Sequence, residues 1–375
     1  MTDKSTAPGL FGALFTALVL IAWASPAPDH VTDRLVYEGT AERVIVSDCS
    51  DLQCFRVLVP WVLGRLPGPS GLRWKLYAAA SNAAGAIAVW FLCGVFGLGR
   101  QAATIAAVIS AFGFGSLYTL HDPFTSDPLM YALGPAITQL MLTGRTGLAV
   151  TLSMVGTLAK EFAAAPMYAL ALYHAAAREW IPALRAFAAG NAAFLTWTLL
   201  TIALMLKFNY SWGWNGVGSA NIVGGSALSL WASQQTARGI AAAMFNEFGA
   251  LYILAPAGLL FAPASFRRLA IVSLPIAAMF GYVQQPDRGL WNFHYLVAPL
   301  AAVCLSRAPA ALAWSTVALF AVGNLRVGAQ LPIAPIGRVA IAGSLMLAIA
   351  SVAAALRKPT HAAVGRAFAI NEAGR

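Results

Sequence analysis

The stretch DHVTDRLVYEGTAERVIVSDCSDLQCFRVLVPW, residues 29–61, decides how the rest of the chain is interpreted. It directly follows an apolar run. It holds six of the chain's 14 acidic residues: Asp29, Asp33, Glu38, Glu42, Asp48 and Asp51. In a chain that lies mostly in lipid, charged groups cost least in a loop beside the membrane, where they are free to face a ligand. We therefore expect the chemistry of the molecule to lie in this loop.

The composition is that of a membrane protein. Hydrophobic residues make up 59% of the chain and charged residues 10%, with a mean hydropathy of +0.71, whereas soluble domains carry roughly 25% charged residues. The formal net charge is +10, but the Lys and Arg residues are scattered between apolar runs, mostly singly, and form no patch. This scatter is typical of topology signals and lipid-headgroup contacts, and it argues against a nucleic-acid partner.

The apolar runs predict an all-α fold, a polytopic bundle of about 12 transmembrane helices with 10 to 13 allowed, since a span needs about 20 apolar residues. The three runs between 129 and 177 are short, which favours broken helices that dip to the middle of the membrane. The expected spans are 9–25, 77–98, 102–120, 129–143, 147–159, 162–177, 182–206, 246–264, 269–285, 291–306, 309–325 and 338–356.

These spans divide the chain into one transmembrane domain, 1–358, and a cytoplasmic tail, 359–375. The domain carries a first outer loop at 26–76 and a second at 207–245. The N-terminus resembles a signal peptide, and because many spans follow we favour an uncleaved anchor. Short loops that carry Arg and almost no acid place the N-terminus in the cytoplasm, so the acidic loop faces outward.

The first outer loop is expected to contain helices. Asp33, Tyr37 and Ala41 recur at the spacing of one helix face, and the apolar residues 55–66, with two Arg and a Trp, are typical of a helix along the membrane interface. Cys49 and Cys54 both lie in this loop. They are either a local disulfide or two free thiols.

Asp33 is the sharpest candidate for catalysis. A carboxylate near the bilayer can be desolvated enough to tune its pKa and take a proton from an acceptor. The alternative is a solvated carboxylate paired with Arg34 or Arg56.

The segment between the third and fourth spans supplies a second candidate group. His121, Asp122 and Asp127 offer the ligand types that suit Mg²⁺ or Mn²⁺. Asp127 followed by Pro128 is equally typical of a helix start, with Asp as the N-cap.

Further charged residues interrupt the apolar runs. Lys160 and Glu161 stand together with no other charge for about fifteen residues on either side, and because neighbours on a helix point about 100° apart they do not pair side by side. One of them would meet a substrate phosphate and the other a loop residue, or both would lie in a surface turn. Arg288 is a candidate phosphate clamp, by its planar fork of donors, with His294 close by in sequence. A surface cluster of Asp287 and Arg288 is the alternative.

Several chemistries lack their usual sequence frames. The chain contains no GxxxxGK[ST], no GxGxxG in a strand–helix setting, no HExxH and no GxSxG. Nucleotide hydrolysis, dinucleotide redox chemistry and zinc proteolysis therefore lack their usual frames.

Taken together, the order of these motifs resembles the polytopic GT-C glycosyltransferase superfamily, in its bacterial, polyprenyl-phosphate-sugar-dependent branch. The motifs are DRLVYEGTA (33–41), FRVLVPW (55–61), TSDPL (125–129), LAKE (158–161), and Asp287–Arg288 with the later Pro299.

The resemblance implies an inverting hexosyl- or pentosyltransferase that uses a polyprenyl-phosphate-linked sugar donor. It implies Asp33 as the base, Asp127 as a second acidic position, and Lys160, Glu161 and Arg288 around the donor phosphate. The chain departs from the family because Asp33 is followed by Arg34 and not by a second carboxylate. No cofactor is therefore expected to be required, although a divalent metal, Mg²⁺ or Mn²⁺, stays open at His121 and Asp122. The absence of a long C-terminal domain argues against protein N-glycosylation.

The expected partners follow from the resemblance: the lipid-linked sugar donor, membrane lipid, and a lipid or cell-envelope glycan acceptor. The expected location is the bacterial inner membrane. A multi-pass transporter or lipid flippase is the rival interpretation, with Lys160, Glu161 and Asp127 as coupling charges. A non-catalytic polysaccharide-assembly partner is a third. One cavity shared by the acids would favour the transferase, and a two-sided path would favour transport.

Overall fold

A computed structural model gives the structure of the chain. It describes residues 6–25, 32–43, 52–208, 241, 244–245, 247–283, 290–325 and 334–358.

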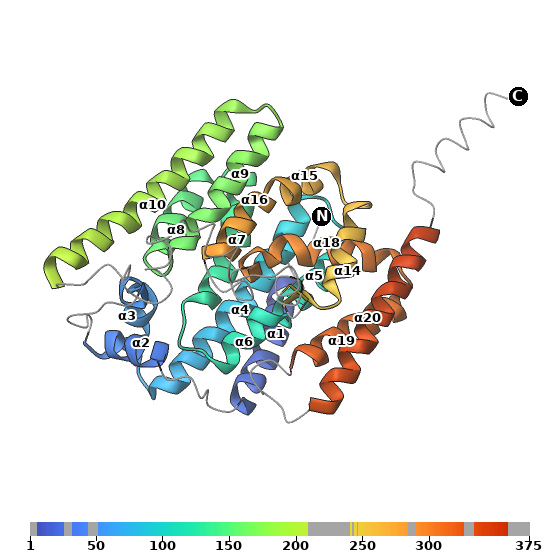
Figure 1. Cartoon of the computed structure of the whole chain (residues 1–375), viewed down its shortest axis with the longest axis horizontal. Coiled ribbons are helices and arrows are strands. Elements are labelled where there is room, and N and C mark those ends of the chain that lie inside the picture. The colour runs from blue at the N-terminus through green and yellow to red at the C-terminus, as the bar shows by residue number, and fades with distance from the viewer. Residues whose placement is uncertain are drawn as a thin grey trace, which may run out of the picture.

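The elements over these residues are helices throughout, and they follow one another as Figure 1 shows. In chain order they are α1 (Thr6–Ala24), α2 (Thr32–Arg43), η1 (Leu52–Phe55), α3 (Leu58–Gly64), α4 (Ser70–Val95), α5 (Arg100–Ala111), α6 (Phe114–His121), α7 (Asp127–Leu142), α8 (Thr146–Thr157), η2 (Glu161–Ala164), α9 (Ala165–Ala176), α10 (Trp180–Phe208), α14 (Leu251–Leu259), α15 (Ala264–Val272), α16 (Leu274–Val283), η4 (Leu290–Phe293), α18 (His294–Arg307), α19 (Ala310–Asn324) and α20 (Ala334–Arg357).

The prediction of an all-α, polytopic membrane bundle is confirmed. Within the described residues, five helical stretches are long and apolar enough to cross a membrane: 6–24, 70–95, 100–121, 180–208 and 336–357. Two shorter apolar helices, α8 and α19, have 12 and 15 residues. The remaining expected spans also coincide with helices, and most of these are shorter than a full crossing requires. The number of crossings therefore stays a prediction.

Helix α4 lies at the centre of the bundle and packs against α1, α5 and α7. Small residues allow this close packing. A Cβ placed on Gly85 of α4 would lie 2.9 Å from the carbonyl oxygen of Tyr131 in α7, so only glycine permits the two backbones to approach this closely. This contact holds the start of α7 against the helix that follows the first loop.

The span expected at 102–120 is broken into α5 and α6 between Phe112 and Gly113. The break makes room for Trp291, which is fully buried: a Cβ on Gly113 would lie 1.9 Å from the Trp291 ring, and one on Gly115 would lie 2.4 Å from it. The indole nitrogen of Trp291 donates a hydrogen bond to Ser116 Oγ over 3.2 Å. The glycines thus end one helix and admit a large side chain from the far end of the sequence.

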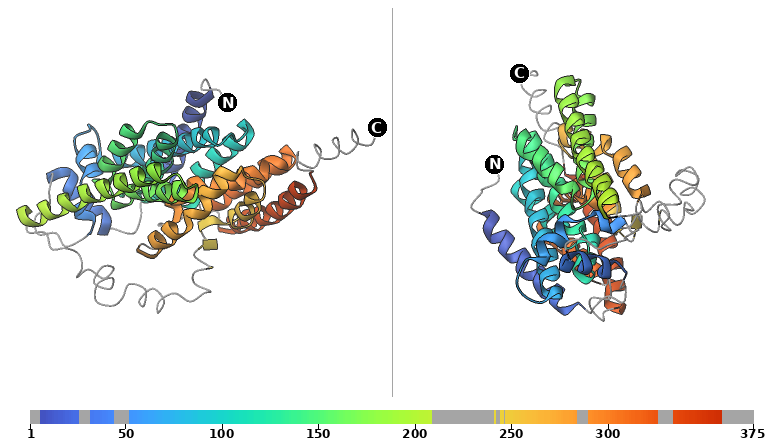
Figure 2. Two further views of the ribbon diagram at one scale, coloured as in Figure 1. Left: turned by 90° about the horizontal axis from the view of Figure 1, so that it is seen from above. Right: turned by 90° about the vertical axis from the view of Figure 1, so that its left-hand side faces the viewer.

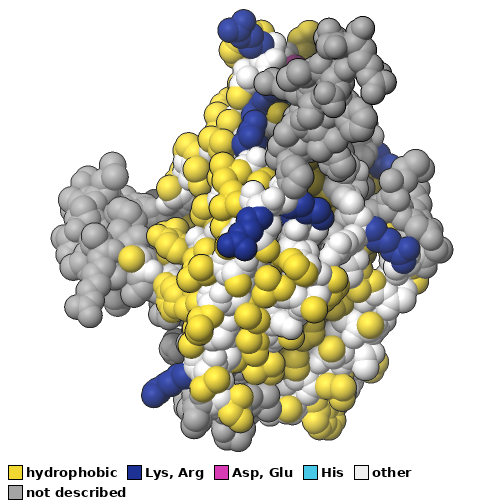
Figure 3. Space-filling model, turned by 90° about the vertical axis from the view of Figure 1, so that its right-hand side faces the viewer, with side chains coloured by type: hydrophobic (Ala, Val, Ile, Leu, Met, Phe, Trp, Pro, Cys, Tyr) yellow, Lys and Arg dark blue, Asp and Glu magenta, His cyan; other side chains and the backbone are white. Residues whose placement is uncertain are grey.

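The surface facing outward from the bundle is largely hydrophobic. Helices α19 and α20 pack on each other at one side of the molecule, and Figure 3 shows that hydrophobic side chains dominate this side, with Lys and Arg set among them and near its edges. Exposed side chains here include Trp314, Val339, Met346 and Ile349. An exposed apolar face of this extent on a helical bundle is suited to lipid contact.

Helix α14 meets α18 at a contact where only glycine fits, which gives a first testable prediction. A Cβ on Gly258 would lie 1.9 Å from the carbonyl oxygen of Leu300, and a backbone atom cannot yield as a side chain does. Gly258→Ala is expected to lower stability by about 1–3 kcal/mol, the usual cost of overpacking. Thermal unfolding in detergent measures it. Gly12→Ala is the matched control, because nothing lies within 4 Å of its added Cβ, and an equal loss in both variants would contradict the explanation.

Candidate functional site

Two ion pairs join segments that are far apart in the sequence. Lys160 Nζ contacts Asp127 Oδ1 at the start of α7, and both side chains are almost fully buried. Next to it in sequence, Glu161 accepts two hydrogen bonds from Arg56, from Nη2 over 2.7 Å and from Nε over 3.3 Å. Arg56 belongs to the first loop, between η1 and α3. The cluster therefore contains two cations and two carboxylates from three separate segments.

The turn between α8 and η2 explains why two adjacent residues find different partners. Lys160 has an extended backbone, with φ −166° and ψ 135°, so α8 cannot continue into η2. The backbone thus changes from extended at Lys160 to helical at Glu161, and the two side chains take different partners, Lys160 in α7 and Glu161 in the first loop. Asp127 is the first residue of α7, with Ser126 at the N-cap position and Pro128 next. The predicted helix start is confirmed, but the N-cap residue is Ser126 and not Asp127.

The first loop is docked onto the bundle by aromatic side chains. The predicted helix at 33–41 is confirmed as α2, with Tyr37 and Ala41 buried. The Tyr37 ring packs on Trp74 of α4 at 5.7 Å between centroids, and Trp74 packs on Phe124 at 5.4 Å. The Arg34 guanidinium lies 4.7 Å from the centre of the Phe124 ring. Helix α2 thus covers the segment that leads to Asp127.

Two further contacts fix the loop beside Arg56. The Leu58 amide donates a hydrogen bond to the Leu158 carbonyl oxygen over 3.1 Å, which ties α3 to the turn that carries Lys160 and Glu161. Cys54 and Phe55 are buried in a small cluster with Leu204 of α10. Figure 1 shows α2 and α3 together near one end of α10. The residues before and after Arg56 are therefore both anchored to the bundle.

The sequence allows the loop cysteines either a local bridge or two free thiols. Cys54 is disulfide-bonded, and Cys49, the partner that the prediction named, lies outside the described residues. Cys93 and Cys304 are free, buried thiols.

The electrostatic surroundings of Arg56 and Glu161 favour the ionised forms of both residues. Burial alone would raise the pKa of Glu161, but the Arg56 guanidinium outweighs it and holds that pKa below the usual value. Burial would likewise lower the pKa of Arg56, and Glu161 reverses this, so the pKa of Arg56 is raised. Burial raises the pKa of Tyr37, although the nearby Arg56 opposes the rise. Arg56 and Glu161 are thus charged, and Tyr37 is a neutral neighbour.

An apolar groove leads away from the cluster. It has a volume of about 860 Å³ and is lined by Glu161 and by hydrophobic side chains of η2, α9, α10 and α16, among them Phe162, Tyr168, Phe194 and Trp197. Among the described residues that line it, Glu161 is the one carboxylate. Figure 2 shows α10 as a long helix at the edge of the molecule, so the groove that it borders lies toward the surface. An elongated apolar ligand with a polar head would fit here.

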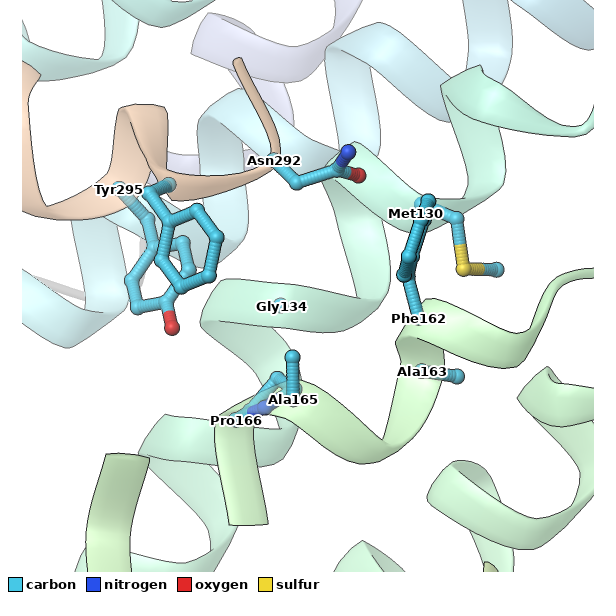
Figure 4. A pocket seen from close by; sticks show the side chains of 9 residues that line it. Met130, Gly134, Phe162, Ala163, Ala165, Pro166, Asn292 and Tyr295 are labelled. Atoms are coloured by element: carbon cyan, nitrogen blue, oxygen red, sulfur yellow. The ribbon is translucent and has the colours of Figure 1, made fainter. Parts of the chain in front are cut away.

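A second, much smaller cavity lies on the other side of η2. Figure 4 shows Met130 and Gly134 of α7, Phe162 and Pro166 of the η2–α9 segment, and Asn292 around it. Its volume is about 10 Å³, enough for a single water molecule at most. Phe162 lines both this cavity and the large groove. The small cavity is therefore no ligand site.

The structure brings together three of the predicted site residues: Asp127, Lys160 and Glu161. Asp33 lies in the first turn of α2, but its side chain lies outside the described residues, as do Asp287 and Arg288. The sequence offered Arg56 as a partner for Asp33, but Arg56 pairs with Glu161. The roles assigned to these residues stay predictions.

His294 lies in a different setting, among aromatic rings. Its Nδ1 donates a hydrogen bond to the Trp291 carbonyl oxygen over 2.9 Å, and its ring stacks on Trp291 at 5.5 Å and meets Tyr131 edge-on at 5.9 Å. It is fully buried. These contacts are those of a packed core histidine.

The predicted metal ligands His121 and Asp122 lie at the end of α6, where Asp122 is buried. Over the residues that the structure describes, no three His, Cys, Asp or Glu side chains lie close enough together to hold a metal ion. The third predicted member of this group, Asp127, pairs with Lys160. A metal at His121 and Asp122 therefore stays a prediction, and no chemical step is assigned to one.

Sequence reasoning did not select Arg56 as a site residue. It appeared only as a possible partner of Asp33. The signal that marks it is its position: Arg56 is a charge inside FRVLVPW, and a buried Arg in an apolar segment needs an acidic partner.

Docking of α2 on α3 gives a second prediction. A Cβ on Gly64 would lie 2.1 Å from the carbonyl oxygen of Ala41, so Gly64→Ala is expected to push α2 away from α3 and lower stability by about 1–3 kcal/mol. Limited proteolysis within the first loop should be faster than in the wild type. Gly71→Ala, whose Cβ meets nothing within 4 Å, is the control. Unchanged proteolysis of the Gly64 variant would mean that this contact does not hold the loop.

The chain matches known proteins in a comparison of structures. No protein-family model matches the chain, and no curated protein matches it. Among solved structures, the chain is similar to the Archaeoglobus fulgidus oligosaccharyltransferase, crystallised with a tethered acceptor peptide that contains an NVT sequon, with a TM-score of 0.49 and 13% sequence identity. The match covers 91% of this chain and 55% of the archaeal enzyme, so the chain spans about half the length of that protein.

Proposed function

We propose that the protein is a membrane glycosyltransferase that moves a sugar from a polyprenyl-phosphate donor to a lipid or cell-envelope glycan acceptor at the outer face of the bacterial inner membrane. The observation that carries the proposal is that Glu161, which lines the 860 Å³ apolar groove, belongs to the charged cluster with Arg56, Lys160 and Asp127. An isoprenoid chain suits the groove, and Arg56 and Lys160 suit the phosphate at its end. A neutral apolar ligand would need no such cations.

The roles of the residues follow from their chemistry. Asp33, at the start of α2, would take the proton of the acceptor hydroxyl or amine as the sugar leaves the phosphate with inversion. Arg56 and Lys160 would stabilise the negative charge that grows on the departing phosphate, with Arg288 as a further phosphate contact. Asp127 would keep Lys160 charged and in place. This mechanism needs no metal ion.

The position of the loop supports the same interpretation. Arg34 lies against Phe124, and Arg34 is the neighbour of Asp33 while Phe124 precedes Asp127 by three residues. The start of α2 therefore lies beside the segment that leads to the buried Lys160–Asp127 pair. A base on this helix would work at the same end of the groove as the phosphate contacts.

The experiment that tests the function begins with the purified full-length protein in lipid nanodiscs. Polyprenyl-phosphate sugars are supplied one at a time together with a lipid extract, and release of polyprenyl phosphate is followed by mass spectrometry. We expect release with at least one sugar. Glycans and lipids of a deletion strain, compared with its parent, identify the product.

Two outcomes would contradict the proposal. One is the absence of donor cleavage together with unchanged glycans in the deletion strain. The other is movement of an intact lipid-linked sugar across vesicles without cleavage of the sugar–phosphate bond, which would favour the flippase.

A further inference from the structure

We infer that Glu161 holds the place on Arg56 that the ligand's phosphate takes on binding, so that the Arg56–Glu161 ion pair is exchanged for an Arg56–phosphate pair. The inference rests on the proposed function, because the phosphate is that of the lipid-linked donor. It adds to that function a residue that competes with the substrate. Glu161 would thus lower the affinity for the donor, whereas Arg56 would raise it.

Charge balance is the first step. Each cation of the cluster already has a carboxylate partner, Arg56 with Glu161 and Lys160 with Asp127. A phosphate that approaches this cluster therefore gains an unoccupied guanidinium only if a carboxylate moves away. Two anions on one guanidinium would repel each other strongly in a site of low polarity.

Exposure decides which carboxylate moves. The side chains of Lys160 and Asp127 are 2% and 3% exposed, whereas those of Arg56 and Glu161 are 9% and 14% exposed. Glu161 also lines the groove, the route by which a lipid chain would bring its phosphate. The phosphate therefore meets the Arg56–Glu161 pair before the inner pair.

Geometry favours a direct exchange. Arg56 binds Glu161 through two nitrogens, Nη2 and Nε. The same fork of donors binds a phosphate through two oxygens. The backbone on either side of Arg56 is held by the Leu58–Leu158 hydrogen bond and by the packing of Cys54 and Phe55 against α10. Arg56 can therefore stay where it is while its partner changes.

The test measures binding and not turnover. The full-length protein in nanodiscs is titrated with farnesyl phosphate, a short isoprenoid monophosphate, and with farnesol as the uncharged probe, against empty nanodiscs. Glu161→Gln keeps the shape of the side chain and removes the competing charge. We expect it to bind farnesyl phosphate about tenfold or more tightly than the wild type, with no change for farnesol.

Two variants control this experiment. Glu179→Gln makes the same chemical change in the exposed pair of His174 and Glu179, at the turn between α9 and α10, and should bind as the wild type does. The double variant Arg56→Gln/Glu161→Gln leaves no unpaired charge in the cluster and removes the proposed phosphate ligand. It should bind farnesyl phosphate at least about tenfold more weakly than Glu161→Gln. Thermal unfolding confirms that each variant is folded.

The outcomes separate the inference from the function on which it rests. Equal or weaker binding of farnesyl phosphate by folded Glu161→Gln overturns the inference, even if the wild type transfers sugar. The same holds if the double variant binds as tightly as Glu161→Gln. Tighter binding by Glu161→Gln together with no donor cleavage by any variant supports the exchange of anions and rejects the transferase.

Discussion

Asp33→Asn is expected to slow sugar transfer by about 100- to 10,000-fold, the usual contribution of a general base. Asparagine has nearly the shape of aspartate but does not accept a proton at neutral pH. Asp33 lies in the first turn of α2, a helix held to the bundle by the buried Tyr37 and Ala41 one and two turns further along. The substitution should therefore leave the loop docked. Donor cleavage, measured with the purified variant in nanodiscs, checks the prediction.

Glu42→Gln is the matched control for Asp33→Asn. It changes another carboxylate of α2 to an amide, and Glu42 is exposed at the far end of the helix. We expect transfer at the wild-type rate. Full activity of Asp33→Asn would exclude Asp33 as the base. Equal loss in both variants would point to the charge of the loop as a whole and not to one catalytic carboxylate.

Asp127→Ala is expected to destabilise the protein by about 3–5 kcal/mol, the usual cost of leaving one partner of a buried ion pair alone. The side chains of Lys160 and Asp127 are only 2% and 3% exposed, so water cannot replace the lost carboxylate. Alanine is also smaller than aspartate, so the substitution leaves space at the start of α7. Unfolding of the detergent-solubilised variant, followed by circular dichroism against temperature, measures the effect.

The double variant Asp127→Ala/Lys160→Met separates charge from packing. It removes both charges and keeps a long side chain at position 160, so it should recover most of the stability lost in Asp127→Ala. Glu179→Ala, in the solvent-exposed pair with His174, should cost no more than about 1 kcal/mol. If the double variant is as unstable as Asp127→Ala, the loss comes from packing around α7 and not from an unpaired lysine.

Hydrophobicity alone predicted the fold class, because each helix that crosses lipid must be apolar along most of its length. The helices at the expected spans 77–98 and 182–206 illustrate this, since α4 and α10 each contain nearly all of the predicted residues. The break between α5 and α6 could not be predicted in the same way. It depends on Trp291, about 180 residues later in the chain, whose ring occupies the space beside Gly113 and Gly115.

The sequence also pointed to Asp127, Lys160 and Glu161, because charges inside apolar runs are conspicuous. It did not show how they pair. That depends on the extended backbone of Lys160 and on the docking of the first loop, which brings Arg56 to a residue 105 positions away. The aromatic side chains that dock the loop, Trp74 and Phe124, carry no charge to mark them among many other aromatics.

Phe162 lines both the groove and the small internal cavity. One side chain thus lies between the large groove and the small cavity lined by residues of α7 and α9 and by Asn292. A smaller residue at this position would merge the two spaces, and a thicker or branched hydrocarbon chain would then find room beyond the present wall. The size of the side chain at position 162 therefore bears on how bulky a ligand the groove accepts beside η2.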